Sequence, residues 1–430
     1  MPTVESPVTC IDAKPKLSAN SDMLKKIGVD QLKIGMHLKE FCGSWMEHPF
    51  WRTGFVLTDP KDIKTILASS IKEVWIDSSR GLDIVVGEVA VTEAESDAQV
   101  EQQMQQAAQM KRVSSPVSTA LELERAAKIC YQSKQAVISM FQEARMGKTV
   151  DVGGAQKMVE EITDSVTRNP GALISLARLK TVDDYTYMHS VAVCAMMVAL
   201  SKQLGQDVEQ TRLAGMAGLM HDLGKAVMPI EVLNKPGNLT NAEFAIIKTH
   251  PVEGHRLLQA SQNVGAVVLD VCLHHHEKTD GSGYPKGLKD RDISVFAKMG
   301  AVCDVYDAIT SNRPYKVGWD PAESLRRMAD WSNGHFDGKI FQAFVKSLGI
   351  YPIGSLVRLT SGRLGVVIDQ TGKSLTMPVV KVFFSTKSNL RIMPVIIDLS
   401  QTSTKEKIVN REDPEKWKFS DLSELWSIPP

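Results

Sequence analysis

Ionisable side chains crowd into one stretch of this sequence. Seven of the ten histidines lie between residues 189 and 276, namely His189, His221, His250, His255, His274, His275 and His276. Imidazole is the nitrogen ligand that zinc, iron, nickel and manganese accept in proteins, and it exchanges protons near neutral pH. Chemistry is therefore expected in this stretch.

Two acids extend the set of candidate ligands. Asp222 follows His221 directly, and Asp304 falls on the same helical face as Met299 and Cys303. A carboxylate on an apolar helix face costs several kcal/mol, of order 2 or more, unless it is paired or bound to a metal. A lone buried histidine is more often a hydrogen-bonded core residue than a ligand. Several such groups on successive helices instead predict a metal centre built from facing helices.

The number of donors indicates two ions. Five histidines and two acids exceed what one ion coordinates while a position stays open for water. Asp222 is the natural bridge, because a carboxylate offers two oxygens. A pair of ions about 3.5 to 4 Å apart suits the hydrolysis of phosphate esters. Imidazole and carboxylate without thiolate fit iron, manganese, zinc or nickel, and these alternatives stay open.

The elements that must position these groups are mostly helices. Apolar residues recur every three or four positions from 116 to 345, which predicts an all-α bundle. Thr240 and Glu243 form a capping-box pattern, so a helix should begin there and carry His250. Residues 1–90 are expected to form a small α+β domain, with strands at 32–38, 54–58 and 73–77 around a helix at 61–69. A polar linker at 91–115, a small β appendage at 346–400 and a polar tail at 401–430 complete the expected organisation.

Composition excludes several classes. Fifty basic and fifty acidic residues leave no net charge, which disfavours a non-specific binder of nucleic-acid polymers. No window approaches the roughly 18 consecutive apolar residues of a membrane span. The six cysteines are dispersed without a CxxC pair, so neither disulfides nor a zinc ribbon is expected. We expect a cytoplasmic protein.

Four linked blocks carry a family resemblance. They are HDLGK (221–225), LTNAEFAIIKTHPVEG (239–254), HHEKTDGSGYPKGL (275–288) and CDVYDAITSNRPY (303–315). In this order they resemble the HD-GYP domain, a branch of the HD phosphohydrolase superfamily. The resemblance implies a mainly α, HD-type helical bundle and a metal-dependent phosphodiesterase. It further implies that a metal-bridging hydroxide hydrolyses cyclic di-GMP to pGpG and onward to GMP. The N-terminal residues resemble a small domain of unknown function that precedes such bundles.

The resemblance also assigns ligands. It implies that one ion, iron or manganese in preference to zinc or nickel, is held by His189, His221, Asp222 and Asp304, and a second by Asp222, His250, His275 and His276. His274 precedes the matching block and is expected to be structural. Tyr185 stands where some members carry a glutamate for a third ion, so two metals are predicted.

Further residues receive roles in the same way. Lys225 and Asp222 are the expected catalytic residues, and Glu277 and Asp307 are expected to orient ligands. Substrate contacts are expected from Arg313, Lys316, Tyr284, Gly283 and Pro285. The Gly-Tyr-Pro tripeptide is linked in this family to docking of GGDEF-domain proteins, which are expected partners beside the cyclic dinucleotide and a second copy of the chain.

Two other functions are compatible with these residues. The substrate could be a mixed cyclic GMP-AMP dinucleotide, because the edges of the pocket that would read the bases are not evident from sequence. The chain could instead be an adaptor that binds a cyclase or a nucleotide without turnover. The complete ligand set argues against the adaptor, because a degenerate domain would have lost at least one ligand.

Overall fold

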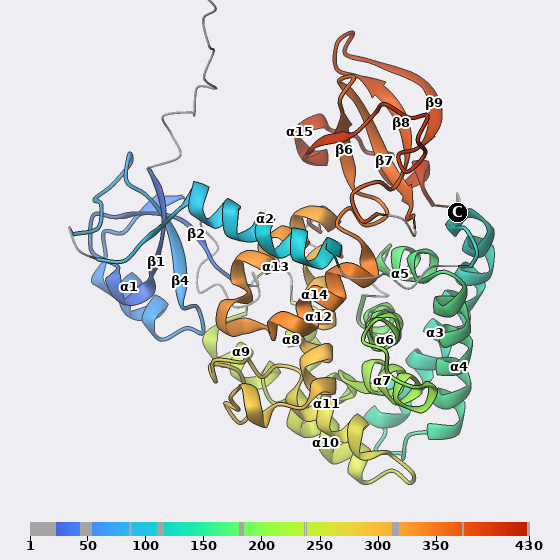
Figure 1. Cartoon of the computed structure of the whole chain (residues 1–430). Coiled ribbons are helices and arrows are strands. Elements are labelled where there is room, and N and C mark those ends of the chain that lie inside the picture. The colour runs from blue at the N-terminus through green and yellow to red at the C-terminus, as the bar shows by residue number, and fades with distance from the viewer. Residues whose placement is uncertain are drawn as a thin grey trace, which may run out of the picture. The chain divides into compact units, whose positions relative to one another are not determined.

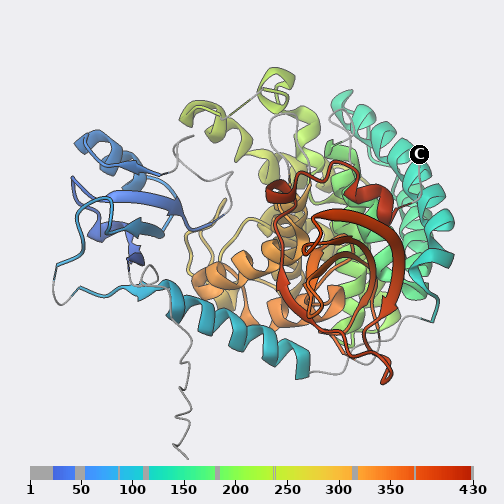
Figure 2. The ribbon, with the colours of Figure 1, turned by 90° about the horizontal axis from the view of Figure 1, so that it is seen from above.

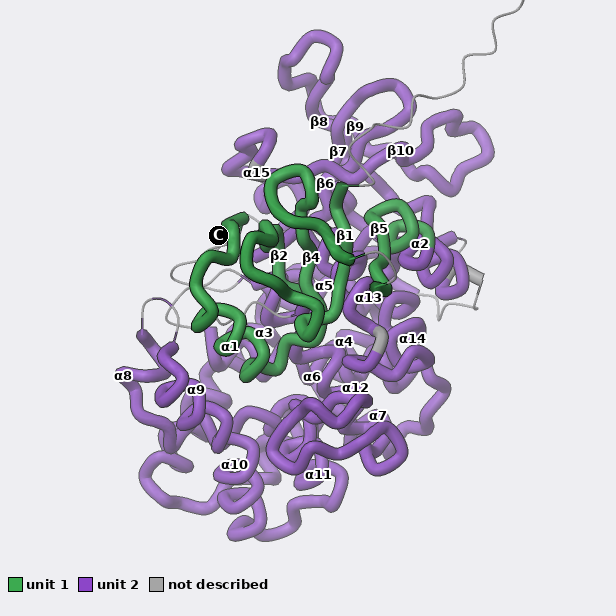
Figure 3. The backbone as a smooth tube through the Cα atoms, turned by 90° about the vertical axis from the view of Figure 1, so that its left-hand side faces the viewer, with its two compact units in different colours: residues 1–42, 49–98 green, residues 43–48, 99–430 purple. Residues whose placement is uncertain are grey.

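The computed structural model describes residues 23–43, 54–85, 88–109, 116–179, 185–235, 237, 239–311, 318–371 and 374–427. The chain divides into two compact units, shown in different colours in Figure 3. One comprises residues 1–42 and 49–98, and the other residues 43–48 and 99–430. We describe each unit by itself.

The first unit is a small antiparallel sheet with one helix. Its strands are β1 (Leu24–Gly28), β2 (His37–Phe41), β3 (Phe55–Val56), β4 (Glu73–Asp77) and β5 (Val91–Thr92), in the order β3-β2-β4-β1-β5. The 3-10 turn η1 (Val29–Gln31) follows β1, and α1 (Pro60–Leu67) leads into β4. An apolar core fills the space between sheet and helix.

Three strands of this unit differ from the sequence expectation, and one of them is β5, which lies in the segment expected as a polar linker. The segment expected as a strand at 32–38 turns at Gly35, where φ is +94°, and only its last two residues belong to β2. The strand β1 was not predicted, because Lys25 and Lys26 interrupt its apolar pattern. The stem of Lys26 is nevertheless buried, and its ammonium lies 6.0 Å from the centre of the Trp75 ring.

The second unit is helical, as expected for an HD-type bundle. After α2 (Glu93–Gln109), which crosses the boundary between the units, the long helices are α3 (Thr119–Arg145), α4 (Val152–Arg168), α5 (Pro170–Arg178), α6 (Tyr185–Gln203) and α7 (Val208–Met220). Shorter elements follow: η3 (Leu223–Val227), α8 (Ile230–Leu233), α9 (Asn241–Ile247), α10 (His250–Gln259), α11 (Ala266–His274) and η4 (Asp290–Asp292). The bundle closes with α12 (Val295–Thr310), α13 (Pro321–His335) and α14 (Gly338–Leu348) (Figure 1).

Two helices form the centre of this bundle. Every residue of α6 from Met188 to Ser201 is buried, and α12 is buried from Met299 to Thr310. A helix that is apolar all round lies inside a protein, so any ionisable group on it needs a partner. None of the helices that the structure describes is long and apolar enough to cross a membrane.

The helix expected to carry His250 is broken in two. Thr240 caps α9 through the amide of Glu243, and Glu243 reaches back to the amide of Thr240, as the sequence predicted. The helix ends at Ile247, however, and α10 begins anew at His250 with Pro251 in its first turn. Proline has no N–H to continue the preceding helix, which explains the break.

A second antiparallel sheet follows the helices, as expected. Its strands are β6 (Leu356–Leu359), β7 (Arg363–Asp369), β8 (Val379–Ser385), β9 (Leu390–Asp398) and β10 (Ile408–Arg411), in the order β10-β6-β7-β8-β9. Figure 2 shows these strands curling around one another. The structure differs from the polar tail expected after residue 400, because β10 pairs with β6. Apolar side chains from α15 (Pro414–Trp417) to the end of η5 (Leu422–Leu425) and Trp426 also pack on the sheet.

The sheet is tied to the bundle by capping interactions. Asp369 at the end of β7 accepts hydrogen bonds from the amide and hydroxyl of Thr119 at the start of α3, at 3.0 and 2.6 Å. Asp320, the cap of α13, also accepts from the amide of Leu356 in β6. Side chains at element ends therefore fix the sheet on the helices.

Candidate metal centre

Five elements bring the predicted ligands to one buried place. His189 lies in α6 and Asp304 in α12, the two central helices. The others lie where helices begin or end: His221 and Asp222 between α7 and η3, His250 at the start of α10, and His275 and His276 directly after α11. All are buried except His276, whose side chain is 17% exposed.

One group of ligand atoms comes from His189, His221 and Asp304, whose donors lie within 4.8 Å of one another. The Nε2 atom of His189 lies 3.0 Å from Oδ1 of Asp304 and 3.2 Å from Nε2 of His221. These separations are short enough for one ion to contact all three side chains.

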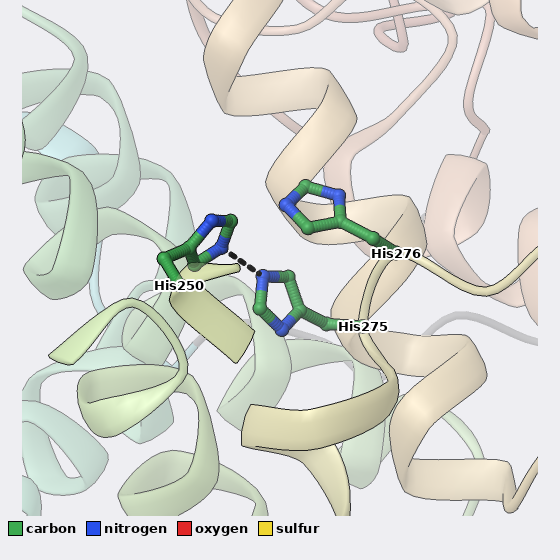
Figure 4. A group of neighbouring side chains, drawn as sticks. All are labelled: His250, His275 and His276. Carbon is green, nitrogen blue, oxygen red and sulfur yellow. Dashed lines mark hydrogen bonds between the residues drawn. The ribbon is translucent and has the colours of Figure 1, made fainter. Parts of the chain in front are cut away.

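A second group comes from His250, His275 and His276, which also meet within 4.8 Å. Figure 4 shows the three rings converging from α10 and from the end of α11. The Nε2 atoms of His250 and His275 lie 3.3 Å apart. Three imidazoles form a second candidate set of ligands beside the first.

Asp222 lies between the two groups. Its Oδ2 atom is 3.3 Å from Nε2 of His189, in the first group, and its Oδ1 atom is 3.2 Å from Nε2 of His250, in the second. Each carboxylate oxygen thus faces a different set of ligands. A bridging carboxylate requires this arrangement.

The imidazoles are held in one orientation by their outer nitrogens. The Nδ1 atoms of His221, His250 and His275 lie 2.7 to 3.0 Å from the backbone carbonyls of Gly218, Ile247 and Val271. A carbonyl only accepts, so each Nδ1 carries the proton and each inward Nε2 keeps its lone pair. For His189 a carboxylate does the same, since Oδ2 of Asp307 lies 2.6 Å from Nδ1.

Buried oxygens without donors test whether a cation fits. Among the described residues, Oδ1 of Asp222 and Oδ2 of Asp304 have no hydrogen-bond partner. The Nε2 atom of His250 is near Oδ1 of Asp222, but its ring proton lies on Nδ1, so two lone pairs face each other. Buried acceptors are normally satisfied. A cation beside each of these aspartate oxygens would supply the missing partner, so the residues present fit a metal.

The charge state of the site suits a metal as well. Burial, reinforced by neighbouring imidazoles, lowers the pKa of His275 to about 3 and holds the pKa of His276 well below its ordinary value. Burial opposes ionisation of both acids, but it is outweighed by Lys225 and the histidines at Asp222 and by the histidines at Asp304. Both pKa values therefore stay well below the usual range. At neutral pH Asp222 and Asp304 are therefore carboxylates, and His275 and His276 are neutral imidazoles.

The surroundings of His189 stabilise a positive charge at the first ligand group. Burial disfavours its charged form, yet hydrogen bonds with Asp222, Asp304 and Asp307 raise its pKa to about 10. Asp307 engages Nδ1, so the proton on Nε2 is the one that Asp222 and Asp304 stabilise. That proton occupies the position that a metal ion would take.

The predicted lysine lies at the edge of the site. The ammonium of Lys225 is 2.5 Å from Oδ2 of Asp222, and its side chain is partly exposed. It can therefore reach an anion bound above the carboxylate while it holds that carboxylate in place.

The Gly-Tyr-Pro loop closes over His276. The Tyr284 ring stacks on the His276 ring at 4.6 Å, and Pro285 follows it through a cis bond. A side-chain carbon at Gly283 would lie 2.4 Å from the amide nitrogen of Lys278, so only glycine fits there. Glu277 accepts hydrogen bonds from the amides of Lys286 and Leu288, so it holds the loop rather than a ligand.

The remaining predicted residues fall outside the ligand groups. His274 bonds Asp270 at 2.8 Å and belongs to neither group. Tyr185 stacks on His189 with ring centres 5.9 Å apart. Arg313 and Lys316 lie outside the described residues.

Sequence reasoning missed Lys248. Its ammonium lies 5.1 Å from the centre of the Phe244 ring and 6.0 Å from that of Tyr284. The available signal was its place two residues before His250. The sequence predicted one continuous helix through residues 248 and 250, and two residues that are two positions apart on a helix point to different sides. Lys248 was therefore expected to point away from the site.

Comparison with known proteins identifies the parts of the chain. Residues 24–155 match a domain of unknown function (DUF3391), and residues 163–340 match the HD domain. The cyclic di-GMP phosphodiesterase PA4108 of Pseudomonas aeruginosa is 52% identical over 94% of this chain and 96% of its own length.

More distant relatives match shorter parts of the chain. The cyclic di-GMP phosphodiesterase response regulator RpfG of Xanthomonas campestris pv. campestris is 34% identical over 49% of this chain and 56% of its own length. The 3'3'-cGAMP-specific phosphodiesterase 1 of Vibrio cholerae is 35% identical over 38% of each chain. The chain matches the HD domain, carries the Gly-Tyr-Pro loop and is similar to a cyclic di-GMP phosphodiesterase along almost its whole length. It therefore belongs to the HD-GYP family of HD-domain phosphodiesterases.

Proposed function

We propose that this protein hydrolyses cyclic di-GMP to pGpG at the centre formed by the two ligand groups, with two divalent ions, iron or manganese. The observation that carries the proposal is Asp222, whose two oxygens face the two groups at 3.3 and 3.2 Å. The substrate is supported by the 52% identity to a cyclic di-GMP phosphodiesterase along almost the whole chain.

The ions would supply an acidified water and neutralise the phosphate oxygens of the substrate. His189, His221, Asp222 and Asp304 would hold one ion, and Asp222, His250, His275 and His276 the other. The chain's own residues orient these ligands, because the outer nitrogens of the rings are anchored.

Lys225 supplies a fixed positive charge beside the reacting phosphate. Its ammonium is anchored on Asp222, so little reorganisation is needed when negative charge develops on the phosphate oxygens. Tyr284 stacks on the ring of His276 and so covers one face of that proposed ligand.

Turnover of cyclic di-GMP tests the proposal. The protein is purified without oxygen, supplied in parallel with iron(II) or manganese(II), and the products are separated by chromatography. We expect pGpG, with loss of both product and bound metal in the Asp222→Ala variant. Full activity in that variant would refute the site.

Two adjacent histidines provide a matched control. His275→Gln removes a predicted ligand, whereas His274→Gln alters a side chain that bonds Asp270 outside the ligand groups. Activity and metal content should fall in the first variant and stay close to wild type in the second. The reverse result would mean that the ligand register is shifted by one residue.

A mixed cyclic GMP-AMP dinucleotide is the second candidate substrate, because a relative specific for 3'3'-cGAMP is 35% identical over part of this chain. A panel of cyclic dinucleotides compared by kcat/KM separates the two substrates. Docking of GGDEF-domain proteins, self-association and the cytoplasmic location stay predictions. Binding of a GGDEF protein without turnover by metal-replete enzyme would favour the adaptor.

A further inference from the structure

A cationic and aromatic cluster lies beside the second ligand group. It consists of Phe244, Lys248 and Tyr284, contributed by α9, by the residue after α9 and by the Gly-Tyr-Pro loop. Tyr284 stacks on His276, and Lys248 lies two residues before His250. The cluster therefore borders the metal centre.

The lysine of this cluster is held by rings rather than by an acid. Lys248 is exposed and has no carboxylate partner among the residues that the structure describes. Lys235, before the same helix, is different because it forms an ion pair with Glu243 at 2.6 Å. An ammonium beside aromatic faces is available to donate hydrogen bonds to a ligand.

Helix α9 is placed to present this cluster to a ligand. None of its residues is buried, and Ile246 is 40% exposed. Phe244 and Lys248 are four residues apart and share one side of the helix. The helix contributes little to the apolar core, so its sequence is free to serve binding.

We propose that Phe244, Lys248 and Tyr284 form a base-binding subsite in which Lys248 selects guanine. The planar rings suit a nucleobase, which stacks on aromatic side chains. Guanine presents two acceptors, O6 and N7, to a lysine, whereas adenine presents N7 beside an amino group that donates. Lys248 is therefore a specificity-determining residue for the proposed reaction, on which this inference rests.

The test compares Lys248→Met with Lys235→Met, because methionine keeps an unbranched apolar stem and removes the ammonium. The ratio of kcat/KM for cyclic di-GMP over cyclic di-AMP is measured for each variant with enzyme in excess. We expect Lys248→Met to lower this ratio roughly ten- to a hundredfold, the range for one lost pair of base contacts. Lys235→Met should leave it unchanged.

A second readout uses the asymmetric 3'3'-cGAMP. Opening one phosphodiester bond gives pApG and opening the other gives pGpA, so the base held in the subsite decides which product forms. Wild type should favour one product, and Lys248→Met should bring the two toward equal amounts. The inference is overturned if Lys248→Met keeps the wild-type ratio of kcat/KM values and the wild-type ratio of products. It is also overturned if kcat/KM falls by the same factor for all three dinucleotides, because that result indicates a contact to phosphate.

Failure of the subsite and failure of the proposed function can be told apart. Calorimetry measures the affinities of wild type and Lys248→Met for cyclic di-GMP and cyclic di-AMP without requiring turnover. Wild type could bind cyclic di-GMP more tightly than cyclic di-AMP, lose this preference in Lys248→Met, and yet hydrolyse neither dinucleotide. That result would refute the proposed function and support the subsite. Hydrolysis of cyclic di-GMP with equal binding of both dinucleotides would refute the subsite alone.

Discussion

Asp307 lies one turn after Asp304 on α12 and fixes the ring of His189. Its carboxylate accepts from Nδ1, which leaves Nε2 directed at the ligand group. In Asp307→Asn the amide could donate to Nδ1 and move the ring proton to Nε2, where it would compete with the metal.

We expect Asp307→Asn to lower metal affinity about 10- to 100-fold, the usual cost of losing such a supporting contact. The measurement is a competition titration with a chelator of known affinity. Asp292→Asn, at an exposed position of η4, is the control and should bind metal like wild type. Equal affinities in all three proteins would show that Asp307 does not orient the ligand.

Sequence alone predicted which side chains meet at the candidate site, but not how they are oriented. An acid on an otherwise buried face of α12 signals a partner, and so does a histidine on α6, because burying either group alone is costly. The register of His274 and His275 followed only from family resemblance, since both lie at the end of one helix. In His221, His250 and His275 the anchoring of Nδ1 on a carbonyl depends on where a helix ends, which sequence patterns do not reveal.

Among the elements, α3 and α4 are joined by an ion pair in which Glu122 is buried and Arg168 is partly exposed. Both carboxylate oxygens of Glu122 accept from Arg168, at 2.8 Å each, and Ser165 donates to one of them. Burial opposes the charge of Glu122, but these donors prevail and lower its pKa below the ordinary 4.5. The pair therefore stabilises the fold above about pH 4.5, and this contribution is lost as the pH falls through the lowered value.

Glu122→Gln should reduce the free energy of unfolding at pH 7 by about 1 to 3 kcal/mol, because it leaves Arg168 without its counter-charge. It should also reduce the loss in the free energy of unfolding as the pH falls from about 5 to about 3, the range in which the carboxyl takes up its proton. Denaturant unfolding at pH 7, pH 5 and pH 3 measures this. Glu209→Gln breaks an exposed pair with Arg212 and should change stability by less than about 1 kcal/mol. Parallel pH dependence in wild type and Glu122→Gln would contradict the assignment.

Element boundaries were predicted unevenly, and the errors have physical causes. The strand at Glu73–Asp77 was predicted to the residue, because turn residues bound a compact apolar run. The strand β9 was missed because Pro394 interrupts it and most of its side chains face solvent. The strand β10 has only four residues, two of them polar, and its pairing with β6 defines it.

For the whole molecule, bound metal should act as a stabilising ligand. The ligands come from elements spread between α6 and α12, so unfolding of the bundle disperses them. An ion at a hundredfold excess over its dissociation constant adds about 2.7 kcal/mol to the free energy of unfolding. The melting temperature should rise on addition of manganese(II) and fall again with a chelator, and Asp222→Ala should show neither change. An identical response in that variant would place the stabilising ions elsewhere.

The identity of the residue at position 222 can also be used to compare homologous sequences. A histidine lost by drift removes a donor from one group only, whereas a change at Asp222 takes an oxygen from both at once. On the proposed function, a relative that keeps every histidine but has another residue at this position would have lost the ligand that joins the two ions. A comparison that separates active enzymes from inactive homologues should therefore examine this aspartate first.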